Sequence, residues 1–93
     1  MTIGLASKAI TAQNVFSDSI AIHGKFNVSI VGISGDTVTV QRSIDNGTTW
    51  FDVKSYTANK QESGEEVEMG WLYRIGVKTG DYSAGTILAR LSF

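Results

Sequence analysis

Apolar and polar side chains alternate along much of this chain. Phe26, Val28 and Ile30, for example, are separated by single polar residues. The same pattern runs through segments 38–44, 71–77 and 87–93. A period of two is typical of strands that bury one face, and no segment keeps a helical period for longer than one turn. The chain is therefore predicted to be all-β.

Turn signals separate these segments, since the chain has 10 glycines and no proline. Short strands spaced by turns are typical of a compact antiparallel β-sandwich or barrel, here of about six to eight strands. A strand is expected at residues 50–56, and one or two more at Val15–Phe16 and 19–22. In the last segment, the side chains predicted to point inward are Ile87, Ala89, Leu91 and Phe93, with Leu88 on the outer face.

The length of 93 residues fits one domain. We expect the sandwich at residues 14–93. Residues 1–13 are expected to form an N-terminal arm or loosely attached segment, because residues 1–9 carry too few bulky apolar side chains for a secure core strand.

Charge and composition exclude several classes of function. The eight basic residues are spread along a chain of formal charge −1, so no cationic footprint for nucleic acid is present. The absence of cysteine excludes disulfides and thiolate metal sites. No stretch approaches the ~20 apolar residues of a membrane helix, so no membrane association is expected.

Residues 43–50 have the Ser-x-Asp-x-Gly-x-Thr-Trp form of an Asp-box hairpin, a motif that recurs in sialidases. The residues that define it are Ser43, Asp45, Gly47, Thr49 and Trp50. The Asp45 carboxylate can accept hydrogen bonds from backbone N–H groups further along the turn. Gly47 supplies a positive φ, and Trp50 starts the return strand. We interpret the motif as a turn, because a sialidase propeller needs several blades of roughly 40–50 residues each.

The register of this hairpin stays open at the sequence level. One loop length pairs Arg42 with Phe51 and Val40 with Val53, whereas another pairs Arg42 with Asp52. A slip of one residue reverses which face is buried.

Nothing in the sequence predicts catalysis, a metal site or a cofactor. Asp45 lacks the second carboxylate that a glycosidase requires. His23, the only histidine, stands beside a glycine at the start of a strand and is interpreted as a turn or surface residue. A sugar-binding platform would draw on Trp50, Phe51, Trp71, Tyr73 and Tyr82. Most of these rings are needed for the core of so small a domain, so a carbohydrate-binding module is the less favoured alternative.

Two segments are candidates for contact with a partner. The first is acidic and contains Glu62, Glu65, Glu66 and Glu68. It is interpreted as a solvated loop that leads into a strand, or alternatively as an acidic docking patch. The second is residues 76–86, a glycine-rich hairpin loop in which Asp81 and Tyr82 stand among small residues.

The missing prolines bear on assembly, because proline often blocks the edge of a sheet. Exposed edges are therefore expected either to take part in assembly or to be guarded by charges such as Lys54 and Lys78.

The chain resembles small β-sandwich proteins encoded among the virion genes of tailed bacteriophages. The likeness rests on residues 24–30, on 38–43 running into the Asp-box and Asp52-Val53, and on 73–86. It implies a non-enzymatic capsid decoration or cement protein, or another head or tail component, assembled in the bacterial host cytoplasm. The implied partner is the major capsid protein or another virion protein, with self-association as a dimer or trimer. Contact is expected through Asp81 and Tyr82, through the glutamate stretch and through the N-terminal arm.

Overall fold

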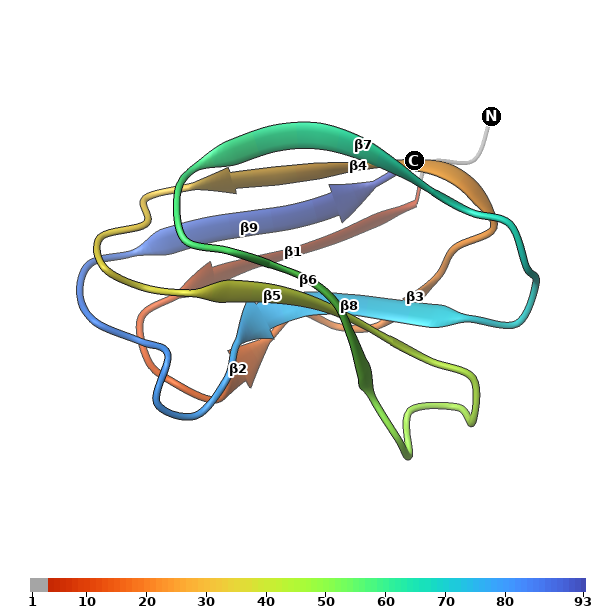
Figure 1. Cartoon of the computed structure of the whole chain (residues 1–93), viewed down its shortest axis with the longest axis horizontal. Coiled ribbons are helices and arrows are strands. Elements are labelled where there is room, and N and C mark those ends of the chain that lie inside the picture. Colours follow the sequence, from red (N-terminus) through yellow and green to blue (C-terminus); the bar gives the residue numbers. More distant parts are fainter. Residues whose placement is uncertain (1–3) are drawn as a thin grey trace.

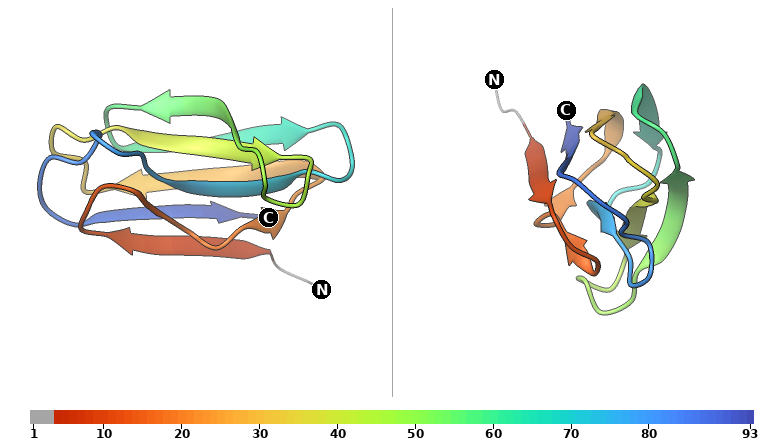
Figure 2. Two further views of the ribbon diagram at one scale, coloured as in Figure 1. Left: turned by 90° about the horizontal axis from the view of Figure 1, so that it is seen from below. Right: turned by 90° about the vertical axis from the view of Figure 1, so that its left-hand side faces the viewer.

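The computed structural model describes residues 4–93 and confirms the all-β prediction. The nine strands are β1 (Leu5–Ile10), β2 (Val15–Phe16), β3 (Ile20–Ala21), β4 (Gly24–Val31), β5 (Val38–Ser43), β6 (Phe51–Tyr56), β7 (Lys60–Glu66), β8 (Leu72–Val77) and β9 (Ile87–Ser92). All strand pairs are antiparallel, and they form two sheets that pack face to face as a β-sandwich (Figures 1 and 2).

The four-stranded sheet has the order β1-β9-β4-β7. The second sheet has the order β2-β8-β5-β6, with the short strand β3 also paired to β8. Strands β6 and β7 are therefore the edges of the two sheets on the same side of the sandwich, and β1 and β2 are the edges on the other side (Figure 2).

The core lies where the predicted inward rows meet. Phe26, Val28 and Ile30 of β4 are buried, and so are the apolar residues in the inward rows of β5, β8 and β9. The core residues are Ile10, Ile22, Phe26, Val28, Ile30, Val38, Val40, Tyr56, Tyr73, Ile75, Val77, Ile87, Ala89 and Leu91. The prediction that Phe93 and Ile44 point inward is wrong. Their side chains are 45% and 49% exposed, because each residue lies just beyond the end of its strand.

The prediction for the N-terminal segment is wrong for residues 5–10. These residues form β1, which pairs along its whole length with β9 and buries Ala6 and Ile10. The sequence signal is weak because only these two side chains face the core, and one of them is small. Residues 1–3 of the expected arm lie outside the described part of the chain.

The β5–β6 hairpin combines features of both proposed registers. Arg42 pairs with Phe51, as in the first alternative, but Val40 pairs with Lys54 instead of Val53. A β-bulge between Val40 and Gln41 causes this shift. It leaves Val53 as the extra residue of β6.

Two predicted loops have a different structure. The glutamate segment is mostly strand β7, which pairs with β4 from Lys60 to Glu66. Its inward row is Glu62, Gly64 and Glu66, so the apolar alternation that marks the other strands is missing. Residues 78–86 do not form a hairpin loop, because β8 and β9 belong to different sheets and the loop crosses between them.

Asp36 fastens this crossover, a role that the sequence analysis missed. Its side chain is 1% exposed and accepts hydrogen bonds from the backbone N–H groups of Ser34, Ser83 and Ala84. The hydrogen bond from Ser34, together with the two from the crossing loop, lowers the pKa of Asp36 although burial opposes the charge. The carboxylate thus holds the 78–86 loop against the β4–β5 connection.

The sheet edges are blunted without proline. Strands β2 and β3 have two residues each, β6 carries the bulge, and β7 is rich in charge. On β1, Lys8 stands in the inward row opposite Ala89 and is exposed. Short, bulged and charged edges all resist further pairing. Lys54 and Lys78 form ion pairs with Glu62 and Asp52.

Candidate interaction site

In the turn at residues 43–50, the polar side chains of Ser43 and Asp45 form hydrogen bonds to other groups of the same turn. Ser43 Oγ donates to Asp45 Oδ1 at 2.7 Å, and the same carboxylate oxygen accepts from the N–H of Thr49 at 2.8 Å. The N–H of Gly47 donates to Ser43 Oγ at 2.9 Å, and Gly47 has a φ of +91°. The backbone hydrogen bond from Thr49, with the Ser43 hydroxyl, lowers the pKa of Asp45 to about 2. Such a carboxylate stays ionised and makes a poor general acid.

The ring of Trp50 also packs against another side chain of the protein. The Arg74 guanidinium lies between two rings, with its carbon 4.2 Å from the Trp50 centroid and 4.1 Å from that of Phe16. Arg74 Nε donates to Gln41 Oε1, and Gln41 Nε2 donates to Asp52 Oδ1. This stack ties the turn to β2, β5 and β8 on the outer face of the second sheet.

The five aromatic residues proposed as a sugar platform do not share one surface. Trp50 packs on the outer face of the second sheet, whereas Tyr73 is buried. Tyr82 packs against the core from the β8–β9 loop, where its hydroxyl donates to the carbonyl of Gly85. Phe51 and Trp71 line a surface hollow together with the edge of Tyr73.

Two of the four candidate glutamates link the two sheets. Glu62 of β7 accepts hydrogen bonds from Lys54 Nζ at 2.9 Å and from the Tyr56 hydroxyl, both on β6. Burial, and then the bond to Glu62, raises the pKa of Tyr56. Glu66 is 3% exposed and is held by Arg42 of β5 and by the Tyr73 hydroxyl of β8, at 2.7 Å.

Glu66 is therefore a buried but fully partnered carboxylate. Burial opposes its ionisation, but the hydrogen bonds from Tyr73, Arg42 and the Glu68 N–H outweigh this effect and lower the pKa of Glu66. Burial, and then the bond to Glu66, raises the pKa of Tyr73 to about 12. Arg42 also lies 3.9 Å above the Trp71 ring. These groups fasten the sandwich where no apolar side chain of β7 faces the core.

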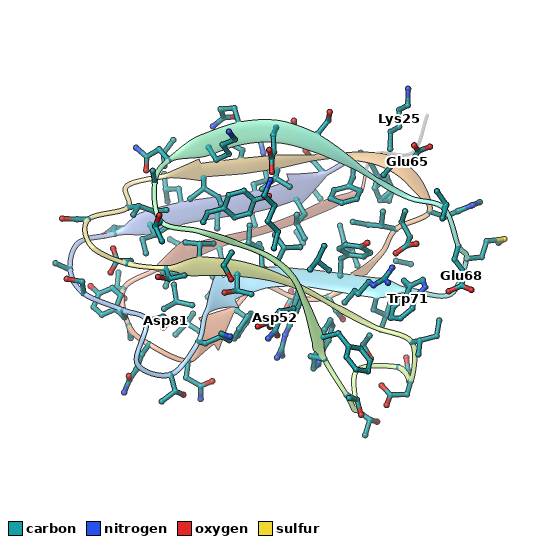
Figure 3. All side chains as sticks on the ribbon, viewed as in Figure 1. Lys25, Asp52, Glu65, Glu68, Trp71 and Asp81 are labelled. Atoms are coloured by element: carbon teal, nitrogen blue, oxygen red, sulfur yellow. The ribbon has the colours of Figure 1, made fainter. Side chains whose placement is uncertain are left out.

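Glu65 and Glu68 face solvent. They lie at the end of the molecule that carries the 67–71 loop, and Glu68 accepts a hydrogen bond from Trp71 Nε1 (Figure 3). Asp81 lies at the opposite end (Figure 3). The sequence-predicted contact residues thus divide between two ends of the sandwich.

The most apolar exposed region is the end formed by the β5–β6 hairpin and the 67–71 loop, which we call the apolar end. Of the nine large apolar residues that are exposed within residues 4–93, five belong to it: Ile44, Phe51, Val53, Val67 and Met69. Val67 and Met69 are 83% and 73% exposed. The sequence analysis passed over both residues, because they lie in a loop outside any alternating pattern.

A hollow of about 590 Å³ opens at the apolar end between β6 and β7. Phe51, Val53 and Trp71 line it, with Arg42 and Glu65 among the polar lining. Bulges are common next to functional sites, and Val53, the extra residue of this bulge, lines the hollow together with Phe51. Exposed apolar clusters with polar rims are typical of protein-contact surfaces.

In residues 4–93, no three His, Asp or Glu side chains gather in a way that would hold a metal ion. The same residues contain no helix with the length and apolarity to cross a membrane. Comparisons with protein-family models, with curated proteins and with solved structures gave no match for this chain.

Proposed function

We propose that this chain is a non-enzymatic structural protein of a tailed-bacteriophage virion, which decorates the capsid and stabilises it through repeated contacts with coat protein. The sequence resemblance supports the virion assignment, and the apolar end supports binding to a protein. The observation that carries the proposal is the exposure of five large apolar side chains at one end of the sandwich, two of which, Phe51 and Val53, line the hollow. Carboxylates near it, such as Asp45 and Glu66, are committed to the chain's own hydrogen bonds.

The energetics suit a protein present in many copies. Burying an exposed large apolar side chain contributes roughly 1.5–3 kcal/mol. Much of the gain from a few such side chains is offset by the lost freedom of the bound molecule. A single contact is therefore weak, and adjacent sites on a repeating shell increase the total effect.

The proposal is tested by co-sedimentation with capsids of the parent phage that lack the protein. Wild type should bind to saturation at a fixed ratio to coat subunits. Phe51→Ser and Met69→Ser should each weaken binding by about tenfold, since each removes an apolar side chain from the contact. Met69 is so exposed that its replacement should leave thermal stability unchanged.

Asp81→Ser, in the loop at the opposite end, is the matched comparison. If this change removes binding and the two apolar-end variants do not, the contact has been placed at the wrong end. No binding of the wild type to capsids, together with a glycan-array signal that depends on Phe51 and Trp71, would replace the proposal with the carbohydrate-binding alternative.

A further inference from the structure

The outer face of the four-stranded sheet carries a second exposed apolar row. Leu88 of β9 pairs with Ala9 of β1 on one side and with Val31 of β4 on the other. Leu88 and Val31 are 53% and 40% exposed. The row lies at the end where β4 stops and β9 starts, opposite the end with the 44–50 and 67–71 loops (Figure 1).

This row borders a shallow hollow of about 660 Å³. Its lining includes Leu5, which is 55% exposed, and the exposed cation Arg90. We call this surface the sheet face, defined by Leu5, Ala9, Val31, Leu88 and Arg90. In the register, Arg90 lies between Ser7 and Ser29, the row next to Leu88.

The sheet face is cationic without a balancing acid. No Asp or Glu lines the hollow. The ion pairs found within residues 4–93 use other cations, namely Arg42, Lys54 and Lys78. A chain of net charge −1 thus presents an exposed arginine beside aliphatic side chains on this face.

We propose that the sheet face is a second binding surface, which takes an acidic, aliphatic segment of a coat protein. Carboxylates of the partner would lie against Arg90 while its aliphatic side chains cover Leu88 and Val31, since complementary charge selects partners and orients them. The same face of a second copy is a poor occupant, because it would bring like charges together. This inference rests on the proposed function.

Two binding surfaces on different parts of the sandwich have a mechanical consequence. The apolar end binds one coat subunit and the sheet face binds its neighbour, so each copy bridges a subunit boundary. The second contact is intramolecular once the first has formed, which raises the effective affinity without enlarging either surface.

The test compares charge variants in the capsid co-sedimentation assay at about 50 and about 500 mM NaCl, a change that shortens the Debye length by about threefold. Arg90→Glu should weaken binding by about tenfold or more at low salt, because it opposes the partner's carboxylates. Arg90→Lys, which keeps the charge, should stay within about threefold of wild type. Wild-type binding should weaken at high salt, and Arg90→Glu should flatten this dependence.

Lys60→Glu is the matched control. It makes the same charge change in the same sheet, but Lys60 pairs with the buried Ile30 and so belongs to the row that faces the other sheet. This variant should bind like wild type. If Arg90→Glu binds capsids as well as wild type does, or if Lys60→Glu is equally impaired, the inference is overturned and the proposed function stands. If wild type fails to bind capsids, both fall together.

Discussion

Replacing Glu66 by Gln should destabilise the fold at neutral pH by roughly 2 kcal/mol. Gln has nearly the same shape and still offers an oxygen to the Tyr73 hydroxyl, which lies 2.7 Å away. The carboxylate charge is lost, and with it the ion pair to Arg42. The perturbation therefore isolates the charge of the inter-sheet link from its packing.

The magnitude follows from the geometry. A hydrogen bond to a charged group contributes about 1.5–3 kcal/mol, against about 0.5–1.5 for a neutral one. Breaking a fully buried pair would cost about 3–5 kcal/mol. The Arg42 side chain is 36% exposed, so water solvates the orphaned guanidinium and reduces that loss. A loss of roughly 2 kcal/mol corresponds to a fall in Tm of about 10 °C for a domain of this size.

The effect should depend on pH with a defined sign. The pKa of Glu66 in the folded protein is below its ordinary value of 4.5. Its contribution to stability is therefore complete above pH 4.5 and is lost as the pH falls through the folded-state pKa. The gap between wild type and Glu66→Gln should narrow in acid, since a protonated Glu66 resembles Gln.

Urea unfolding at a series of pH values from neutral to acidic measures this gap, and an unchanged m value shows that both proteins unfold in the same way. Glu65→Gln is the control, because the adjacent residue is exposed and makes no ion pair within residues 4–93. It should change stability by less than about 0.5 kcal/mol. A similarly small effect of Glu66→Gln at neutral pH would refute the conclusion that the charge of Glu66 links the two sheets. A stability difference between the two proteins that stays constant in acid would refute it as well.

Three further substitutions test individual parts of the fold. Gly47→Val should destabilise by about 1–3 kcal/mol in a thermal melt, because a β-branched residue is strained at φ +91°; an unchanged Tm would show that the turn is adaptable. Gly76→Ala should cost more than about 2 kcal/mol and speed hydrogen exchange in β2, because a Cβ there would lie 2.6 Å from the Phe16 Cα, and the backbone has no room to accept it. Arg74→Lys should cost about 1–2 kcal/mol, since Lys keeps the charge but loses the flat stack between Phe16 and Trp50; equal stability of the two proteins would mean that the stack contributes nothing.

The candidate site was only partly predictable. Glu65 and Glu68 were proposed as contact residues and lie at the apolar end, whereas Glu62 and Glu66 from the same stretch hold the two sheets together. Asp81 lies at the opposite end (Figure 3). Charge density in a sequence does not reveal which carboxylates face cations from another sheet, because only the packing of the two sheets brings those cations opposite them.

The sequence by itself determined the strands that bury apolar rows. The alternation of apolar and polar residues is a property of each segment by itself, and it specifies which face of the strand must be buried whichever strands pair with it. This holds for the buried rows Phe26, Val28 and Ile30, and Tyr73, Ile75 and Val77. The turn at residues 43–50 is local too, since its hydrogen bonds join residues at most four apart.

Only the tertiary structure decided the identity of β7 and the path from β8 to β9. Glu62 and Glu66 face inward because their hydrogen-bond partners lie opposite them on the other sheet, namely Lys54, Tyr56, Arg42 and Tyr73. A strand with such an inward row lacks the alternating apolar residues from which the other strands were predicted. The glycine-rich loop after β8 crosses to the other sheet instead of turning back, because Asp36 binds its backbone from the β4–β5 connection. A residue pattern within a segment specifies its local conformation, whereas polar contacts with other parts of the chain specify where the segment lies in the fold.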